Sequence, residues 1–259
     1  MANWVIDKQL CCKDQLCLKV CVMRNIILGP DGYPIAGDAC LACGHCQAVC
    51  PKDAITLNQV AAQSLPLAQK EKIDLELMKS LIKSRRSIRE FKDEPLDKKL
   101  FDNLLDTLRW SPTGGNSQLV NWLVVESAEK RKEISRLVIE WMKGNDNFRP
   151  LVIAWKKGYD PILRGAPVLA IAHAGNEYGS TAADCIIAVH TLDLLANSQK
   201  LGTCWAGFVM LALAANFQPL REYLELPANH QGYAALMLGY PAVNYKRVPE
   251  RNPLKVRRM

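Results

Sequence analysis

The sequence lacks any long apolar run, and its first residues lack the pattern of a secretion signal. The longest nearly apolar stretch, Trp205–Ala215, is well short of the roughly 20 residues that a membrane-spanning helix needs, so we expect it to be buried core. Residues 1–7 contain neither a basic region nor an apolar segment of the kind that directs secretion. We therefore expect a cytoplasmic protein with reduced thiols and no membrane segment.

Two common kinds of site are missing as well. The sequence shows no Ser-His-Asp or Cys-His nucleophile arrangement, because His173, His190 and His230 stand isolated in apolar or loop segments. It has no Rossmann glycine fingerprint, which only weakly disfavours a nicotinamide.

The net charge of the chain is +7, and the excess of basic residues follows residue 60, since five basic and five acidic residues balance before it. Scattered basic residues without an aromatic ladder favour a phosphate-bearing cofactor over nucleic acid.

Cysteine is present but very unevenly placed, because eight of the ten cysteines precede residue 51. Four of them have the C-x2-C-x2-C-x3-C spacing and are followed by Pro51: Cys40, Cys43, Cys46 and Cys50. This spacing is typical of a cubane iron–sulfur cluster, whose last cysteine reaches to a second cluster. An earlier run has the same frame with one substitution: Cys11, Asp14, Cys17 and Cys21.

Together the two runs resemble the two-cluster bacterial ferredoxins. In that family each cluster takes three ligands from one run and the fourth from the other. The resemblance implies one cluster held by Cys11, Asp14, Cys17 and Cys50, and another held by Cys21, Cys40, Cys43 and Cys46. Both are expected to be 4Fe–4S clusters.

Asp14 departs from the ferredoxin pattern, and Cys12 is an extra thiol beside it. A carboxylate is a harder ligand than a thiolate, so the iron at Asp14 should be labile and a 3Fe–4S form becomes available. Two alternatives stay open, namely Cys12 as the ligand after a local shift, and a zinc site. We weigh Asp14 about two to one over Cys12, and zinc rarely shows this interlocked spacing.

The signals for secondary structure divide the chain into a ferredoxin-like domain over residues 1–60, a linker over 61–73 and a larger domain over 74–259. Gly29–Gly32 predicts a hairpin turn, and residues 54–57 predict the closing strand of the small domain. In the large domain, Asp74, Asp97 and Ser127 each precede a helical pattern. Strands are expected near residues 122–125, 165–172 and 234–238. The helix over residues 182–199 is apolar on nearly all sides, so we expect it to be buried all round, either in a core or between subunits.

A basic cluster follows the first of these helices and contains three guanidinium groups and a hydroxyl: Arg85, Arg86, Ser87 and Arg89. Guanidinium groups match phosphate oxygens bidentately, so an anion here would neutralise the crowded charge. After the next helix comes a polar loop with paired glycines, in which Thr113, Asn116 and Gln118 can both donate and accept hydrogen bonds.

These two stretches resemble the nitroreductase family of FMN enzymes, with its R-x-S-x-R-x-F motif, a helix, and then S-P-T/S-x-x-N-x-Q. The resemblance runs from about Asp74 to the C-terminus. It implies an α+β architecture, namely an α/β sandwich with a mixed sheet flanked by helices, in a domain-swapped homodimer. It also implies FMN contacts, with the polar loop supplied by the partner subunit: Arg85, Arg86, Ser87, Arg89, Thr113, Asn116 and Gln118.

The resemblance extends to two later segments. Ala206 and Gly207 match positions that lie along the flavin, although the family often has glutamate where Ala206 stands. Lys246 and Arg247 resemble a terminal basic pair on the FMN phosphate. The implied function is an FMN oxidoreductase whose iron–sulfur clusters exchange single electrons with the flavin.

The acceptor implied is a small electrophile such as a nitroaromatic or a quinone, and the donor is reduced ferredoxin or NAD(P)H. Two alternatives remain open at this stage. One is a non-catalytic electron-transfer or flavin module that docks on a larger complex. The other is a flavin reductive dehalogenase or dehydrogenase of the same fold.

Overall fold

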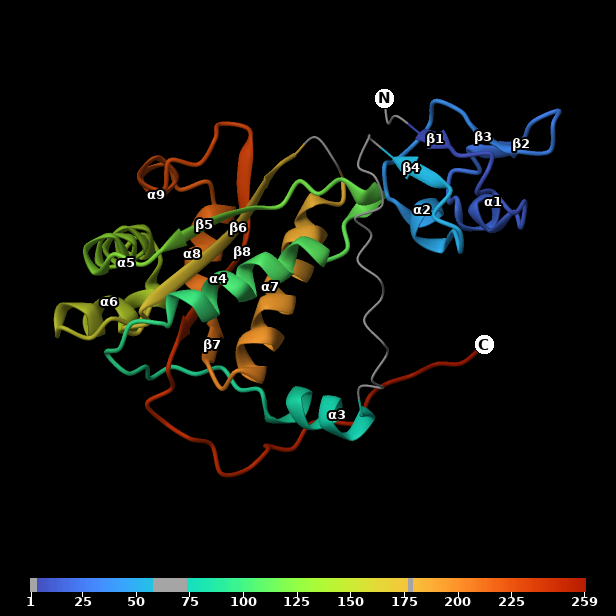
Figure 1. The fold of residues 1–259 in the computed structure, drawn as a ribbon. Coiled ribbons are helices and arrows are strands. Elements are labelled where there is room, and N and C mark those ends of the chain that lie inside the picture. Colours follow the sequence, from blue (N-terminus) through green and yellow to red (C-terminus); the bar gives the residue numbers. More distant parts are fainter. Residues whose placement is uncertain (1–3, 58–73, 177–178) are drawn as a thin grey trace. The chain divides into compact units, whose positions relative to one another are not determined.

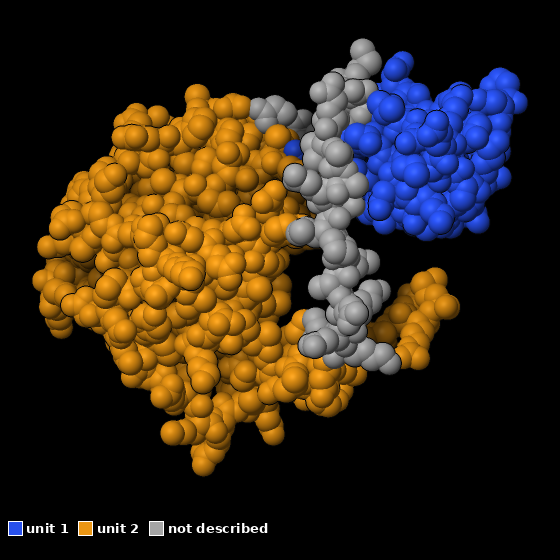
Figure 2. Space-filling view, in the orientation of Figure 1, with its two compact units in different colours: residues 1–73, 114–117 blue, residues 74–113, 118–259 orange. Residues whose placement is uncertain are grey.

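The computed structural model describes residues 4–57, 74–176 and 179–259, and the chain divides into two compact units (Figure 2). The first unit comprises Met1–Ile73 and Gly114–Ser117, and the second comprises Asp74–Thr113 and Gln118–Met259. The domain boundaries given by the sequence analysis remain predictions. The sequence does not predict the grouping of Gly114–Ser117 with the first unit. The predicted linker over residues 61–73 lies outside the described residues.

The first unit consists of two similar halves, each built from short strands and one short helix (Figure 1). Two antiparallel pairs form its sheets, β1 (Trp4–Ile6) with β4 (Ile55–Leu57) and β2 (Ile26–Leu28) with β3 (Pro34–Ala36). The predicted hairpin and closing strand are therefore present. The helices are α1 (Leu16–Val20) and α2 (His45–Val49), and each follows a residue with left-handed backbone geometry.

The second unit is organised around a four-stranded sheet in the order β5-β6-β8-β7. Its strands are β5 (Asn121–Val125), β6 (Val168–Gly175), β7 (Gly202–Trp205) and β8 (His230–Gly239). All three pairings are antiparallel, which corrects the expectation of a mixed sheet. Within the described residues, a parallel contact occurs at this sheet as an isolated bridge between Ser87 and Thr203. This bridge lies outside the named strands.

Helices cover both faces of this sheet. They are α3 (Leu75–Ser84), α4 (Lys98–Thr107), α5 (Ala128–Met142), α6 (Arg149–Lys156), α7 (Thr181–Ser198), α8 (Gly207–Ala214) and α9 (Gln218–Tyr223). The predicted starts of α3, α4 and α5 are confirmed, since the side chains of Asp74, Asp97 and Ser127 accept hydrogen bonds from backbone N–H groups of the first turn. Among the described residues, no helix combines the length and apolarity that crossing a bilayer would require.

The core of the second unit has two layers because β6 is buried on both faces. Leu169 and Ile171 of β6 face a layer formed with α5, α8 and α9. The alternate residues Val168, Ala170 and Ala172 face a layer formed with α4 and α7. This period of two follows from strand geometry and explains why β6 reads as an unbroken apolar run.

The prediction for α7 was burial all round, either in a core or between subunits. Within the described chain the helix is only partly buried, because Val189 and Leu192 are fully buried while Ile186 and Ile187 are 45% and 39% exposed. The helix packs on β6 and β8 and also contacts α3 and α4, and the described chain leaves Ile186 and Ile187 partly exposed. The apolar face predicted for α3 is also exposed, with Leu77 at 70%. An apolar pattern predicts that a face will be covered but not which chain covers it.

A pair of histidines joins the ends of β6 and β8. The Nδ1 atoms of His173 and His230 lie 2.9 Å apart, so one proton can be shared between them. His173 is only 8% exposed. Burial lowers the pKa of His173, and the nearby His230 ring lowers it further.

We expect this pair to make the stability of the fold depend on pH. Below the ordinary histidine pKa of about 6.5, the unfolded chain binds a proton at His173 that the folded chain does not bind. The free energy of unfolding should therefore fall as the pH falls from 7.5 to 5.0, by at most about 1.4 kcal/mol per pH unit for this group. Urea titrations at several pH values should show that the free energy of unfolding depends less on pH in His173→Gln than in the wild type, and equally on pH in His190→Gln. The same pH dependence in all three proteins would contradict the assignment.

Candidate functional site

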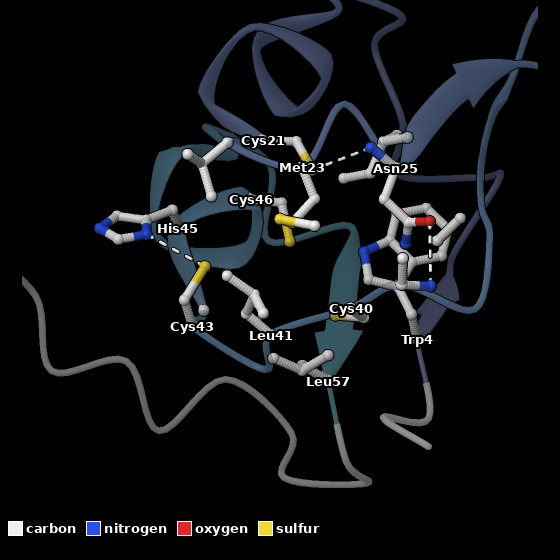
Figure 3. Close-up of a pocket in the computed structure, with 15 residues that line it drawn as sticks. Trp4, Cys21, Met23, Asn25, Cys40, Leu41, Cys43, His45, Cys46 and Leu57 are labelled. Carbon is white, nitrogen blue, oxygen red and sulfur yellow. Dashed lines mark hydrogen bonds between the residues drawn. The ribbon is translucent and has the colours of Figure 1, made fainter. Parts of the chain in front are cut away.

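Four cysteines from both halves of the first unit surround one pocket (Figure 3). Cys46 lies in α2, Cys40 and Cys43 precede this helix, and Cys21 directly follows α1. The pocket has a cavity volume of about 30 Å³. These are the four residues that the ferredoxin resemblance assigns to one cluster.

A second pocket, with a cavity volume of about 10 Å³, brings together the other set of predicted ligands: Cys11, Cys12, Asp14, Cys17 and Cys50. Both candidates for the unusual position line it. Asp14 already has local partners, because Oδ1 accepts from the backbone N–H of Leu16 at 3.1 Å and Cys12 Sγ lies 3.5 Å from Oδ2. Burial raises the pKa of the Cys17 thiol in this pocket.

Hydrogen-bond donors reach the sulfur atoms in a pattern that repeats between the halves. The backbone N–H of Asn25 donates to Cys21 Sγ and that of Ala54 donates to Cys50 Sγ, each at 3.3 Å and each four residues after its cysteine. His45 was expected to point outward between ligands. It is exposed, but its Nδ1 lies 3.1 Å from Cys43 Sγ (Figure 3). Donors of this kind stabilise negative charge on sulfur.

Trp4 supplies an unused donor in the first pocket. Its Nε1 is buried and has no hydrogen-bond partner among the described residues. Burial raises the pKa of Cys46, and the nearby Trp4 N–H opposes this shift, although it does not reach the sulfur in hydrogen-bond geometry. A buried N–H without an acceptor is costly, so the pocket is suited to a group that presents acceptor atoms, such as sulfide.

In the described part of the first unit, the cysteine side chains line the two pockets and do not converge on a single metal position. Among the described residues, no three His, Cys, Asp or Glu side chains converge where a single metal ion could bind. A zinc ion needs about four ligands within roughly 2.3 Å of one centre. A cubane is instead bound at its separate corners.

In the second unit, the predicted arginine motif has a mixed set of partners. Arg85 Nη1 lies 3.5 Å from a carboxylate oxygen of Asp193, which is buried in α7. Arg86 Nη2 donates to the carbonyl of Lys83, while its buried Nε has no partner among the described residues. Arg89 is exposed. The backbone at Ser87 forms the bridge to Thr203 at the edge of the sheet.

The predicted polar loop is divided between the units. Thr113 and Gln118 line one pocket of the second unit, with a cavity volume of about 370 Å³, together with Ser111 and Trp122. Ser111 Oγ is buried and has no partner in the described part of the chain. Asn116 belongs to the first unit, where its Nδ2 donates to the carbonyl of Ala42 at 3.2 Å.

The remaining predicted residues lie around β7 and after β8. Ala206 is buried, and its backbone N–H donates to the carbonyl of Ala235 at 2.8 Å. Gly207 begins α8, and a Cβ added there would meet open space. Lys246 and Arg247 are exposed, and no described contact joins them to the arginine motif.

Cys185 and Cys204 are buried in the second unit, as expected for structural thiols. Burial raises the pKa of Cys185 to about 12, with a smaller contribution from Asp184. Burial also raises the pKa of Cys204. Both thiols stay protonated at neutral pH and are poor nucleophiles.

Two residues of this region escaped the sequence analysis. Asp193 could have been noticed, because it is an isolated acid within the most apolar part of α7. Ser111 also had a signal, because it is the serine of the S-P-T/S-x-x-N-x-Q motif, although it was not named as a contact.

A model of the Nitroreductase family matches residues 82–240 of the chain. The chain is 30% identical over 182 residues to a Bacillus subtilis protein named FMN reductase (NAD(P)H), covering 67% of this chain and 69% of that protein. Over 55 residues it is 42% identical to a protein of Hydrogenibacillus schlegelii named Ferredoxin 7Fe, covering 21% of this chain and 70% of that protein. A Desulfitobacterium hafniense nitroreductase structure with bound FMN aligns with a TM-score of 0.59 and 22% identity, over 69% of this chain and 97% of that one. The α+β fold predicted for the second unit is thereby confirmed as nitroreductase-like.

Proposed function

The chain belongs to the nitroreductase family and is an oxidoreductase, and from this premise we propose that it uses FMN and takes electrons from NAD(P)H. The family match over residues 82–240, with the relative named FMN reductase, carries the proposal. The acceptor is a small electrophile such as a nitroaromatic or a quinone. Reduced ferredoxin is an alternative donor.

The partner-less polar atoms of the second unit support an FMN site. A buried Arg86 Nε without an acceptor suits a phosphate oxygen, and a buried Ser111 Oγ suits a polar ring atom. In this proposal Arg85, Arg86, Ser87 and Arg89 hold the phosphate and the ring. Lys246 and Arg247 add positive charge at the phosphate.

The polar loop and the start of α8 would position the ring. Thr113 and Gln118 offer hydrogen bonds in their pocket, and Asn116 offers an amide. Open space at Gly207 allows a flat group to approach the backbone, and buried Ala206 keeps that approach apolar and dry. When bound, FMN supplies a ring that takes up hydride or single electrons.

We extend the proposal to iron–sulfur clusters in the first unit. The ligands would be Cys21, Cys40, Cys43 and Cys46 in one pocket, and Cys11, Asp14, Cys17 and Cys50 in the other. The grouping of these side chains, the sulfur-directed N–H groups and the unused Trp4 N–H support it. One-electron carriers beside a flavin give the protein a means to pass electrons singly to or from a two-electron centre.

The second pocket favours a cluster that readily loses one iron. Asp14 offers oxygen where the repeat has sulfur at Cys43, and Asp14 already accepts a hydrogen bond from Leu16. A 3Fe–4S cluster with a 4Fe–4S cluster totals seven iron atoms, which agrees with the name of the relative Ferredoxin 7Fe.

We also propose a homodimer in which the partner supplies the polar loop. The uncovered apolar residues Ile186 and Ile187 of α7, and Leu77 of α3, would become buried in it. The domain swap implied by the resemblance belongs to this proposal.

The flavin proposal predicts that Arg85→Ala combined with Arg247→Ala purifies without flavin absorbance while keeping its iron. The reason is that two guanidinium groups that neutralise the phosphate are lost. NAD(P)H-dependent reduction of a nitroaromatic should fall at least about tenfold, because one lost charge-assisted bond already costs about 1.5 kcal/mol or more. The matched control is Arg136→Ala with Arg149→Ala, which removes the same charge from exposed positions. Stoichiometric FMN in the first double variant would refute the site, and a fully loaded wild type without turnover would favour a non-catalytic module.

The cluster proposal predicts that Asp14→Cys gives a cluster that resists air. A fourth thiolate binds iron in a sulfide cage better than a carboxylate does, so the three-iron signal in paramagnetic resonance should largely disappear. Cys12→Ser is the matched control, since it removes the neighbouring thiol and keeps Asp14. An unchanged three-iron signal in Asp14→Cys, together with a stronger three-iron signal in Cys12→Ser, would assign the ligand to Cys12 instead.

A further inference from the structure

Asp193 is a buried carboxylate in the middle of the long helix α7. It is 1% exposed, and the residues around it in the helix are mainly apolar. A carboxylate in such a place is stable only when polar partners surround it. The partners of Asp193 therefore indicate what the residue is for.

Each carboxylate oxygen of Asp193 has a distinct set of neighbours. Oδ1 accepts hydrogen bonds from the Thr203 hydroxyl and from Asn197 Nδ2, the latter at 3.0 Å. Oδ2 faces Arg85 Nη1 at 3.5 Å and His190 Nδ1 at 4.0 Å. The first set fixes the carboxylate in place, which leaves the second oxygen to hold the guanidinium.

Thr203 connects the same carboxylate to the backbone of the arginine motif. Its carbonyl accepts from the N–H of Ile88 at 2.8 Å, and its backbone forms the bridge to Ser87. Asp193 thus contacts the side chain of Arg85 directly and reaches Ser87 through Thr203. The start and the middle of the motif are therefore fixed relative to α7.

The ion pair leaves most of the guanidinium available. Only Nη1 of Arg85 faces Asp193, and in the described residues Nη2 and Nε have no hydrogen-bond partner. The side chain is 23% exposed, so its remaining donors are not sealed off from a ligand. A planar guanidinium held along one edge can present another edge to phosphate.

We propose that Asp193 is a positioning residue that orients Arg85 toward the phosphate of FMN and so makes the site prefer a phosphorylated flavin. The inference rests on the proposed FMN site. It adds that the preference of FMN over riboflavin depends on a carboxylate that does not touch the cofactor. Holding Arg85 in advance removes the cost of ordering a long side chain on binding.

The test compares the dissociation constants of FMN and riboflavin for the full-length protein and for Asp193→Asn, freed of bound flavin beforehand. Positioning predicts that the FMN constant rises about fivefold or more while the riboflavin constant changes less than about twofold. Loss of the negative charge alone would tighten FMN binding, because Asp193 opposes the positive charge at the phosphate. A structural defect alone would weaken both flavins equally. Either of these outcomes, or an unchanged ratio, overturns the proposal.

Two further variants complete the test. Asp184→Asn removes another buried carboxylate of α7, one that accepts from Ser180, and should leave the ratio of the two constants unchanged. Adding Asp193→Asn to Arg85→Ala should cause no further loss of FMN preference, since Asp193 acts through Arg85. A further loss in the double variant would overturn the proposal.

A structure of the unmodified protein with FMN gives a test that requires no variant to fold. Asp193 should remain within about 4 Å of Arg85 while another guanidinium nitrogen contacts the phosphate. An Arg85 that has left Asp193 overturns the inference. A wild type that binds neither flavin refutes the FMN site itself, and this result is distinct from a wild type that prefers FMN but is insensitive to Asp193→Asn.

Discussion

Crowded positive charge between Arg85 and Arg89 is the constraint on which the site of the second unit depends. Three guanidinium groups within five residues repel one another unless acids or anions lie near them. In the described residues, Arg85 alone of the three has an ion pair, and its partner Asp193 is buried among apolar residues of α7. The charge on Arg86 and Arg89 is left for an anion. Thr203, at the edge of the sheet, holds this motif in place. The packing of the core therefore also positions the site.

The stability of the first unit is limited by its apolar core, which is very small among the described residues. The cluster of buried residues consists of Cys17, Ile26, Cys46 and Ile55, so two of its four members are cysteines. A unit of this size rarely folds stably on so few apolar contacts without a metal or disulfides. Bound clusters would take the place of a core here. The repeat of N–H to sulfur bonds from Asn25 and Ala54 shows that the backbone is already shaped around the sulfur atoms.

Local signals in the sequence predicted much of this structure, and long-range packing accounts for the rest. Asp74, Asp97 and Ser127 mark helix starts through their own side chains, so no distant residue was needed to recognise them. The resemblance to the two-cluster ferredoxins implied which side chains share each pocket. The antiparallel sheet and the uncovered face of α7 depend on residues far apart in sequence or on another chain. Asp193 was missed because its partner Arg85 is over a hundred residues away.

The account claims that one chain carries iron–sulfur clusters and FMN, each in its own unit. Protein purified without air can be analysed at once for iron, acid-labile sulfide and flavin, with an absorption spectrum of the same sample. The account predicts about seven to eight iron atoms, about eight sulfides and one FMN per chain. Zinc without acid-labile sulfide, or either prosthetic group consistently without the other, would contradict it.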